Sequence, residues 1–315
     1  MMEKCLCCYK PLKTGEVDFH KTCARKMFGT AQAPTIPYTR KEINELARLV
    51  IDKRATVTGV QSKLSMDVEK NESAVPQRLT IVGVLGRYIL KPQSERFECL
   101  PEVEDLTMHL AEIARIETVP HSLIRFADGE LNYITRRIDR TGDGRKLPME
   151  DFCQIAGLLT EQKYQGSYEY IAKLIQQYSS IPGLDVTKFW EQVIFSWIVG
   201  NADMHLKNFS LISTERGKYH LTPTYDQLST TLVMPEDTDE LALPLQGFKK
   251  GVMPFDFIYA MTDSGVDQKA AERILLRFQK CKVPWFECID QSFITEGQKQ
   301  QYKAIITKHL ETLLK

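Results

Sequence analysis

Apolar positions follow a helical period most clearly between residues 186 and 198. They recur there at i, i+3, i+4, i+7, i+8, i+11 and i+12, as Val186, Phe189, Trp190, Val193, Ile194, Trp197 and Ile198. This spacing places them on one face and predicts a well-buried helix. We expect Asp185 to cap the start of this helix and Gly200 to end it. The polar segment that follows should therefore stand on a rigid platform, where functional loops are often placed.

The first half of the chain shows a different pattern, in which short apolar runs are separated by turn residues. Leu64, Met66 and Val68 alternate as in a strand, and further strands are expected at residues 78–82, 87–91, 121–126 and 131–135. A capping box formed by Thr39 and Glu42 predicts a helix that starts near residue 39. Another helix is expected from residue 100, with a proline in its first turn.

Beyond the long helix, the pattern predicts one hairpin and several amphipathic helices. The hairpin pairs residues 209–212 with residues 219–221, and the helices cover residues 254–260, 267–278 and 295–314. The fold class is therefore predicted to be α+β, with a small sheet-rich lobe followed by a larger helical lobe. We expect three parts: a Cys/His-rich segment and connector (1–38), the sheet-rich lobe (39–135) and the helical lobe (136–315).

Composition narrows the functional class. The chain has 315 residues, 43% of them hydrophobic, which is enough for one large or two ordinary domains. Lys plus Arg equals Asp plus Glu at 41 each, so the overall charge gives no indication of wholesale binding to nucleic acid or to an anionic membrane. The sequence contains neither a membrane-spanning run nor the apolar core of a signal peptide, so a cytoplasmic location is expected.

Four of the eight cysteines gather at the start of the chain. Cys5 and Cys8 form one pair of potential metal ligands, and His20 and Cys23 form a second pair eleven residues later. Two such pairs can close a tetrahedron around a structural zinc ion. The alternative is a redox-inert segment in which only some cysteines pack, and the additional Cys7 leaves open which pair would ligate.

The most informative segment is the polar run from Gly200 to Phe209. It carries Asp203, an asparagine five positions later (Asn208), and a further aspartate eighteen residues beyond that (Asp226). Phosphoryl transfer needs these groups: a carboxylate that orients the attacking hydroxyl and two oxygen ligands for magnesium. In isolation, the same residue types are common in ordinary turns.

Upstream segments contain further groups that such an enzyme needs. Residues 55–65 are rich in hydroxyl and amide donors around Gly59, and backbone amides in such a turn can cradle phosphates. Lys91 ends a predicted strand, where it can pair with nucleotide phosphates. Acidic residues that could hold this lysine lie on the helix that follows, although all of them also suit a helix N-terminus: Glu102, Glu104 and Asp105. Residues 136–140 would then cross into the helical lobe.

These motifs together resemble the HipA family of bacterial serine/threonine kinases, which are toxins of toxin–antitoxin modules. The resemblance rests on Thr56-Val-Thr-Gly-Val-Gln-Ser-Lys63, Tyr88-Ile-Leu-Lys91, Leu100-Pro-Glu-Val-Glu104, Arg137-Ile-Asp-Arg140, Glu150-Asp-Phe-Cys-Gln154, Asn201-Ala-Asp-Met-His-Leu-Lys-Asn-Phe-Ser210 and Thr222-Pro-Thr-Tyr-Asp226. It runs from about residue 56 to near the C-terminus and implies a bilobal protein-kinase-like fold. The chain is similar in particular to short HipT-type members, because only about 38 residues precede the first helix of the kinase part.

The resemblance implies a role for each matching residue. Asp203 would be the catalytic base, Lys91 the phosphate-binding lysine and Glu104 its partner. Asn208 and Asp226 would bind Mg²⁺, and His205 would steady the loop or a phosphate. The residues implied in ATP binding are Thr58, Gly59, Val60, Gln61, Ser62, Lys63, Lys91, Arg136, Arg137 and Ile138. Autophosphorylation would fall on Thr56 or Thr58, where the family carries serines, and the added negative charge would inactivate the kinase.

The resemblance also implies partners. These are a HipB-like antitoxin, a small HipS-like protein as in three-component modules, and DNA only through the antitoxin. The family's substrates are aminoacyl-tRNA synthetases, whose phosphorylation arrests growth. Two other interpretations stay open at this point: a small-molecule kinase, since such enzymes share a loop of this kind, and a silent ATP-binding module with a regulatory function.

Overall fold

A computed structural model of the protein describes residues 3–51, 63–69, 77–82 and 86–314. The chain divides into two compact units. The sheet unit comprises Met1–Asp105, Val119–Arg145 and Gln291–Phe293. The helical unit comprises Leu106–Thr118, Lys146–Asp290 and Ile294–Lys315. The three predicted domain ranges stay predictions, because the units are not contiguous in sequence and exchange short segments.

The sheet unit is built on an antiparallel sheet. In the described part of the chain its five strands run in the order β2-β1-β3-β5-β4. Their bounds are β1 (Leu64–Val68), β2 (Leu79–Ile81), β3 (Tyr88–Lys91), β4 (His121–Arg125) and β5 (Leu131–Arg136). Each strand lies where the apolar pattern predicts one. Leu90 and Ile134 face each other across β3 and β5, and both are fully buried, which sets the register of Lys91 opposite Tyr133.

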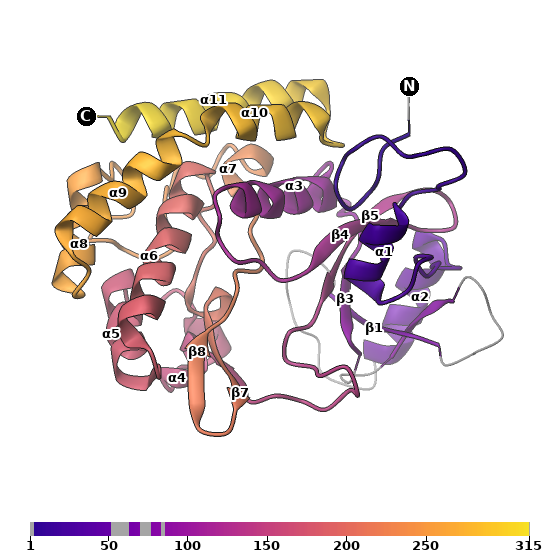
Figure 1. Cartoon of the computed structure of the whole chain (residues 1–315), viewed down its shortest axis with the longest axis horizontal. Coiled ribbons are helices and arrows are strands. Elements are labelled where there is room, and N and C mark those ends of the chain that lie inside the picture. The colour runs from indigo at the N-terminus through magenta and orange to yellow at the C-terminus, as the bar shows by residue number, and fades with distance from the viewer. Residues whose placement is uncertain (1–2, 52–62, 70–76, 83–85, 315) are drawn as a thin grey trace. The chain divides into compact units, whose positions relative to one another are not determined.

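Two helices belong to the same unit, α1 (Lys21–Phe28) and α2 (Arg40–Ile51) (Figure 1). The predicted capping box at the start of α2 is present. The Thr39 amide donates to Oε2 of Glu42 over 2.8 Å, and the Glu42 amide donates to Oγ1 of Thr39 over 3.4 Å. One hydrophobic cluster joins the N-terminal segment and α1 to the sheet, including Leu6, Met27, Met66, Leu90 and Leu123.

Helix α3 (Leu100–Ile113) begins in the sheet unit and continues in the helical unit after Asp105. The other elements of the helical unit are β6 (Met149–Asp151), α4 (Phe152–Ile155), η1 (Thr160–Gln162), α5 (Tyr168–Tyr178), α6 (Pro182–Ile198), η2 (Leu206–Asn208), β7 (Ser210–Glu215), β8 (Lys218–Leu221), α7 (Thr230–Val233), α8 (Pro254–Asp263), α9 (Gln268–Gln279), α10 (Lys282–Gln291) and α11 (Glu296–Thr312). Figure 1 shows α5 beside α6, and α11 runs along the end of α6.

Helix α6 carries the predicted apolar stripe. All of its stripe residues are at most 1% exposed, and the helix ends before Gly200. The expected cap is wrong, because α6 begins three residues earlier, at Pro182, and Asp185 lies inside its first turn. Its buried carboxylate instead accepts hydrogen bonds from the Ser179 hydroxyl (2.6 Å) and from the Leu221 amide (2.9 Å). Asp185 therefore ties α6 to β8. None of the helices that the structure describes combines the length and apolar character needed to span a bilayer.

Candidate active site

Lys91 stands at the end of β3, buried at 4% exposure. Its ammonium pairs with Oε1 of Glu104, which is 1% exposed, and lies 5.3 Å from the centre of the Tyr133 ring. A buried ammonium left unpaired would destabilise the fold by several kcal/mol, so the carboxylate is needed to keep this lysine charged inside the protein. The structure thus brings together the lysine and the acid that the sequence singled out.

The neighbouring acid Glu102 is engaged elsewhere. The side-chain amide of Gln93 donates to its Oε2 over 2.7 Å. Burial raises the pKa of Glu102, and the hydrogen bond from Gln93 lowers it by less. Glu104, and not Glu102, is therefore the partner of Lys91.

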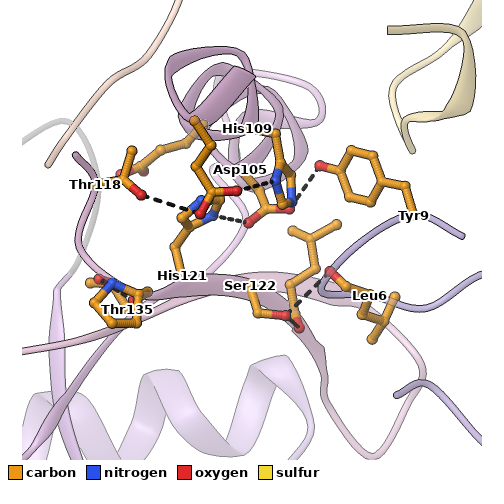
Figure 2. Close-up of polar contacts among 12 residues, drawn as sticks. Leu6, Tyr9, Asp105, His109, Thr118, His121, Ser122 and Thr135 are labelled. Atoms are coloured by element: carbon orange, nitrogen blue, oxygen red, sulfur yellow. Dashed lines mark hydrogen bonds and ion pairs between the residues drawn. The ribbon is translucent and has the colours of Figure 1, made fainter. Parts of the chain in front are cut away.

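The first turns of α3 are also anchored by Asp105, which is fully buried (Figure 2). The hydroxyl of Tyr9 donates to its Oδ2 over 2.7 Å, and Nδ1 of His121 lies 2.7 Å from its Oδ1. Asp105 thereby connects α3 to the N-terminal segment and to β4. This connection fixes the part of α3 that carries Glu104. The sequence suggested only a generic helix-start acid here, because both partners of Asp105 are distant along the chain.

In the helical unit, the loop after α6 is held by a network around Asn201. Its side-chain amide donates to Oε1 of Gln227 over 3.0 Å, and its Oδ1 accepts from the Asp203 amide over 3.2 Å. The Ala202 amide donates to Oγ1 of Thr230 over 2.8 Å. Side chains from residues 227–230 and from Asn201 itself therefore hold the turn that presents Asp203.

Asp203 and Asn208 are coupled directly. The side-chain amide of Asn208 donates to the backbone carbonyl of Asp203 over 2.9 Å. Because the NH₂ group is used in this bond, the amide oxygen of Asn208 faces the other way and can act as a ligand. The carboxylate of Asp203 accepts from the hydroxyl of Tyr164 over 2.6 Å. Sequence reasoning missed Tyr164, which lies 39 residues upstream.

His205 is one of the buried residues of the loop, at 5% exposure. Burial lowers its pKa to about 4, against the opposing effects of the Asp203 and Asp226 carboxylates, so the ring is neutral at neutral pH. Its Nδ1 accepts from the Lys207 amide over 3.3 Å, which places the ring proton on Nε2. A neutral, buried imidazole organises the loop and supplies no positive charge to a phosphate.

Asp226 lies in a strained backbone conformation, with φ of 54°. The segment before it is tied to the loop, because the hydroxyl of Tyr225 donates to the carbonyl of Lys207 over 3.1 Å. The negative charge of the Asp226 carboxylate has a small raising effect on the pKa of His205. Four predicted site residues thus converge in this unit: Asp203, His205, Asn208 and Asp226.

The remaining predicted nucleotide-binding residues fall in two groups. Residues 136–138 lie at the end of β5, whose last residue is Arg136. The Arg136 amide donates to the Pro120 carbonyl and the Arg137 amide to the Arg87 carbonyl, so these two N–H groups are already bonded. Lys63 is exposed immediately before β1. The other predicted residues lie outside the described residues: Thr56, Thr58, Gly59, Val60, Gln61 and Ser62.

Comparisons with known proteins identify the family of the chain. Residues 55–285 match the family model described as HipA-like C-terminal domain. Two Sinorhizobium fredii proteins named "Putative kinase Y4mE" and "Putative kinase Y4dM" are each 32% identical, over 60% and 62% of this chain. The chain spans about half of their length, 46% and 50% respectively. A Haemophilus influenzae "Putative kinase" is 28% identical over 79% of this chain and 75% of its own.

Solved structures show the same fold. The chain matches HipA in a complex of the Shewanella oneidensis HipA and HipB toxin–antitoxin system with operator DNA, at a TM-score of 0.69 and 18% identity over 96% of this chain and 74% of that one. It matches the Helicobacter pylori proinflammatory kinase CtkA at a TM-score of 0.55 and 13% identity, over 79% of this chain and 93% of that one. The predicted α+β fold of the protein-kinase type is therefore confirmed.

Proposed function

We propose that this chain, which belongs to the HipA-like C-terminal domain family, is an ATP-dependent protein kinase. The observation that carries the proposal is the loop in which the side chain of Asn208 is hydrogen-bonded to the backbone of Asp203. The hydrogen bond from Tyr225 to the carbonyl of Lys207 ties the residue before Asp226 to the same loop. An aspartate next to an amide and a second carboxylate is the set of groups that phosphoryl transfer requires. The buried pair of Lys91 and Glu104 in the sheet unit supports the same function.

In this proposal Asp203 accepts the proton of the substrate hydroxyl as that oxygen bonds to the γ-phosphorus of ATP, while the bond from the γ-phosphorus to the β–γ bridging oxygen breaks and ADP leaves with that oxygen. Lys91 holds the α- and β-phosphates of ATP, and Glu104 keeps its ammonium in place. Asn208 and Asp226 would hold Mg²⁺, since amide and carboxylate oxygens are the hard ligands this ion prefers. When bound, Mg²⁺ neutralises charge on the phosphates. His205 is a neutral ring that stabilises the loop by accepting the hydrogen bond from the Lys207 amide.

The acceptor is proposed to be a serine or threonine hydroxyl, and the biological role that of a toxin in a toxin–antitoxin module. The resemblance to HipA kinases supports an aminoacyl-tRNA synthetase as substrate, with growth arrest as the result. It also supports a HipB-like antitoxin and a small HipS-like protein as partners, as in the modules of the short HipT-type members. Thr56 and Thr58 are the proposed autophosphorylation sites.

The test is Asp203→Ala, measured with radiolabelled ATP in a bacterial lysate and by growth on expression. We expect wild-type protein to label a protein band and to arrest growth. Asp203→Ala should lower the transfer rate by about 10²- to 10⁴-fold, the usual effect of losing a general base, and should relieve arrest. The exposed Asp263, at the end of α8, provides the matched control Asp263→Ala, which should behave as wild type.

Two outcomes would contradict the proposal and identify the alternative. A labelled metabolite with no labelled protein would show a small-molecule kinase. Arrest by Asp203→Ala without detectable transfer would show a silent ATP-binding module that acts by binding alone.

A further inference from the structure

Four soft ligands meet in the N-terminal segment. The ligand atoms of Cys5, Cys8, His20 and Cys23 all lie within 4.8 Å of one another. These residues are scattered over nineteen positions of sequence, and two different local structures bring them together. All four belong to the sheet unit, and none is part of the candidate active site.

The first pair sits in a tight turn. The Tyr9 amide donates to the Cys5 carbonyl over 2.9 Å, and the Cys5 amide donates to the Lys10 carbonyl over 2.9 Å. Tyr9 takes a left-handed conformation, with φ of 62°, immediately after Cys8. A residue with a side chain adopts this conformation only at a cost, so the turn is held by something beyond its own backbone preference. The result is that Cys5 and Cys8 project toward the same point.

The second pair is delivered by α1. His20 precedes the helix in an extended conformation and Cys23 lies within its first turn. Nε2 of His20 is 2.9 Å from the carbonyl of Pro11, a contact in which Nε2 carries the proton and donates. This leaves the lone electron pair on Nδ1, and Nδ1 is the atom that faces Cys8 and Cys23. Ligating histidines in metalloproteins are oriented by this kind of outer hydrogen bond.

The spacing of these atoms matches a zinc tetrahedron. Zn–S bonds of about 2.3 Å and Zn–N bonds of about 2.05 Å imply S···N edges of about 3.6 Å. Nδ1 of His20 is 3.3 Å from Sγ of Cys8 and 3.8 Å from Sγ of Cys23, on either side of that value. We propose that Cys5, Cys8, His20 and Cys23 bind one Zn²⁺ ion. With four protein ligands, the site has no open position for a substrate, so the ion is structural.

Cys7 is excluded from this site by its position. Its Sγ is not part of the group of ligand atoms that lie within 4.8 Å of one another, and its side chain is buried in the hydrophobic cluster with Leu6, Phe19 and Phe28. The structure thereby selects the ligands among the adjacent cysteines of the turn, which the sequence had left open. Cys7 also offers a neighbouring non-ligand for a controlled test.

The proposed ion holds a segment that contacts the kinase fold directly. The Leu123 amide in β4 donates to the Leu6 carbonyl over 3.3 Å, and Ser122 donates to the same carbonyl over 3.2 Å (Figure 2). Tyr9, next to Cys8, donates to Asp105 on α3. The turn that carries Cys5 and Cys8 therefore supports the helix on which Glu104 pairs with Lys91. The ion thus stabilises the sheet unit as well as its own loop.

The test is the metal content of freshly purified, tag-free, full-length protein, together with cobalt substitution. We expect about one equivalent of zinc per chain, and cobalt should give thiolate charge-transfer bands and tetrahedral d–d bands. Cys8→Ser and Cys23→Ser should retain less than about a tenth of an equivalent, since a structural site needs all four ligands. Cys7→Ala should keep the wild-type amount.

The wild-type protein gives a second readout that does not depend on the variants folding. Release of zinc by a mercurial reagent should follow thiol modification, and chelation should raise amide hydrogen exchange in residues 4–24. Wild-type protein without zinc and without a cobalt spectrum would overturn the proposal. Equal metal loss in Cys7→Ala and Cys8→Ser, or unchanged exchange after complete zinc removal, would overturn the ligand assignment or the structural role.

Discussion

The hydroxyl of Tyr164 donates a hydrogen bond to Oδ1 of Asp203 over 2.6 Å, which fixes one oxygen of the proposed catalytic carboxylate. Burial and the Asp203 carboxylate together raise the pKa of Tyr164, so the phenol remains a neutral donor at neutral pH. The ring also packs edge-on against His205, with centroids 5.1 Å apart. Tyr164 is therefore a positioning residue: it holds Asp203 and His205 in a common orientation.

Replacing this tyrosine should slow phosphoryl transfer. Tyr164→Phe removes the hydrogen bond and keeps the ring, and a bond to a charged group contributes about 1.5–3 kcal/mol when well shielded. Tyr164 is half exposed, so we expect the smaller effect, a fall in kcat of roughly tenfold with little change in the KM for ATP. Steady-state kinetics of the two parameters separates this result from a loss of nucleotide binding.

Tyr178 offers the matched control, since it is exposed to a similar degree at the end of α5. Tyr178→Phe should leave both parameters unchanged. If Tyr164→Phe were as active as Tyr178→Phe, the backbone network of Asn201 would be sufficient to position Asp203, and the role given to Tyr164 would be wrong.

The buried ring of His205 should make stability depend on pH. Its pKa is about 4 in the folded state, below its ordinary value of 6.5. Between these values the unfolded chain binds more protons than the folded one, so the free energy of unfolding rises with pH across this window. The contribution of His205 to stability is therefore lost as the pH falls from 6.5 to 4. The shift corresponds to about 3 kcal/mol.

His205→Asn isolates this contribution, because asparagine keeps an acceptor for the Lys207 amide and does not titrate. Urea unfolding at about pH 7.5 and at about pH 4 should show a loss of stability that is smaller in the variant by about 3 kcal/mol. Equal losses in both proteins would mean that His205 is protonated in the folded state. The effect of His309, whose pKa burial also lowers, is common to both proteins and cancels.

Local pattern was sufficient to predict several of the elements that bury one regular face, although α5, which also does so, was not predicted. The stripe of α6 and the two strands β4 and β5 were predicted because a hydrophobic period is a property of neighbouring residues. Helix α10 was missed, since Pro284 interrupts its start and its apolar residues lack a sustained period. The supposed cap Asp185 was misassigned because Pro182 starts the helix earlier.

The candidate site was predictable only where residue types repeat a known order. Asp203, Asn208 and Asp226 carry that order in the sequence itself. The side chains that hold the site in place follow no such order in the sequence. Gln227 is hydrogen-bonded to Asn201, 26 residues away, and Tyr9 to Asp105, 96 residues away. Such long-range pairs depend on the packing of whole units, and a single sequence contains no local signal for them.

The end of α6 provides the sharpest test of how the fold positions the loop. Gly200 has φ of 69°, and a Cβ there would lie 3.0 Å from Cγ2 of Ile305 and 3.0 Å from Cβ of Thr231. Gly200→Ala therefore combines backbone strain with a close contact, and the Thr231 amide that donates to the Gly200 carbonyl would be pushed away. We expect a loss of roughly 2–4 kcal/mol in the free energy of unfolding, together with slower phosphoryl transfer.

Gly217 separates these two causes. Its φ is 79°, but no atom of the described residues lies within 4 Å of the methyl group that alanine would add, so Gly217→Ala bears the backbone strain alone. It should lose only about 1 kcal/mol and keep full activity, because the added methyl group meets no neighbouring atom that it would displace. Thermal and urea unfolding of both variants measure the difference. Equal destabilisation would show that the contact with Thr231 and Ile305 relaxes at no cost, and that the loop is positioned by its hydrogen bonds rather than by the packing of Gly200.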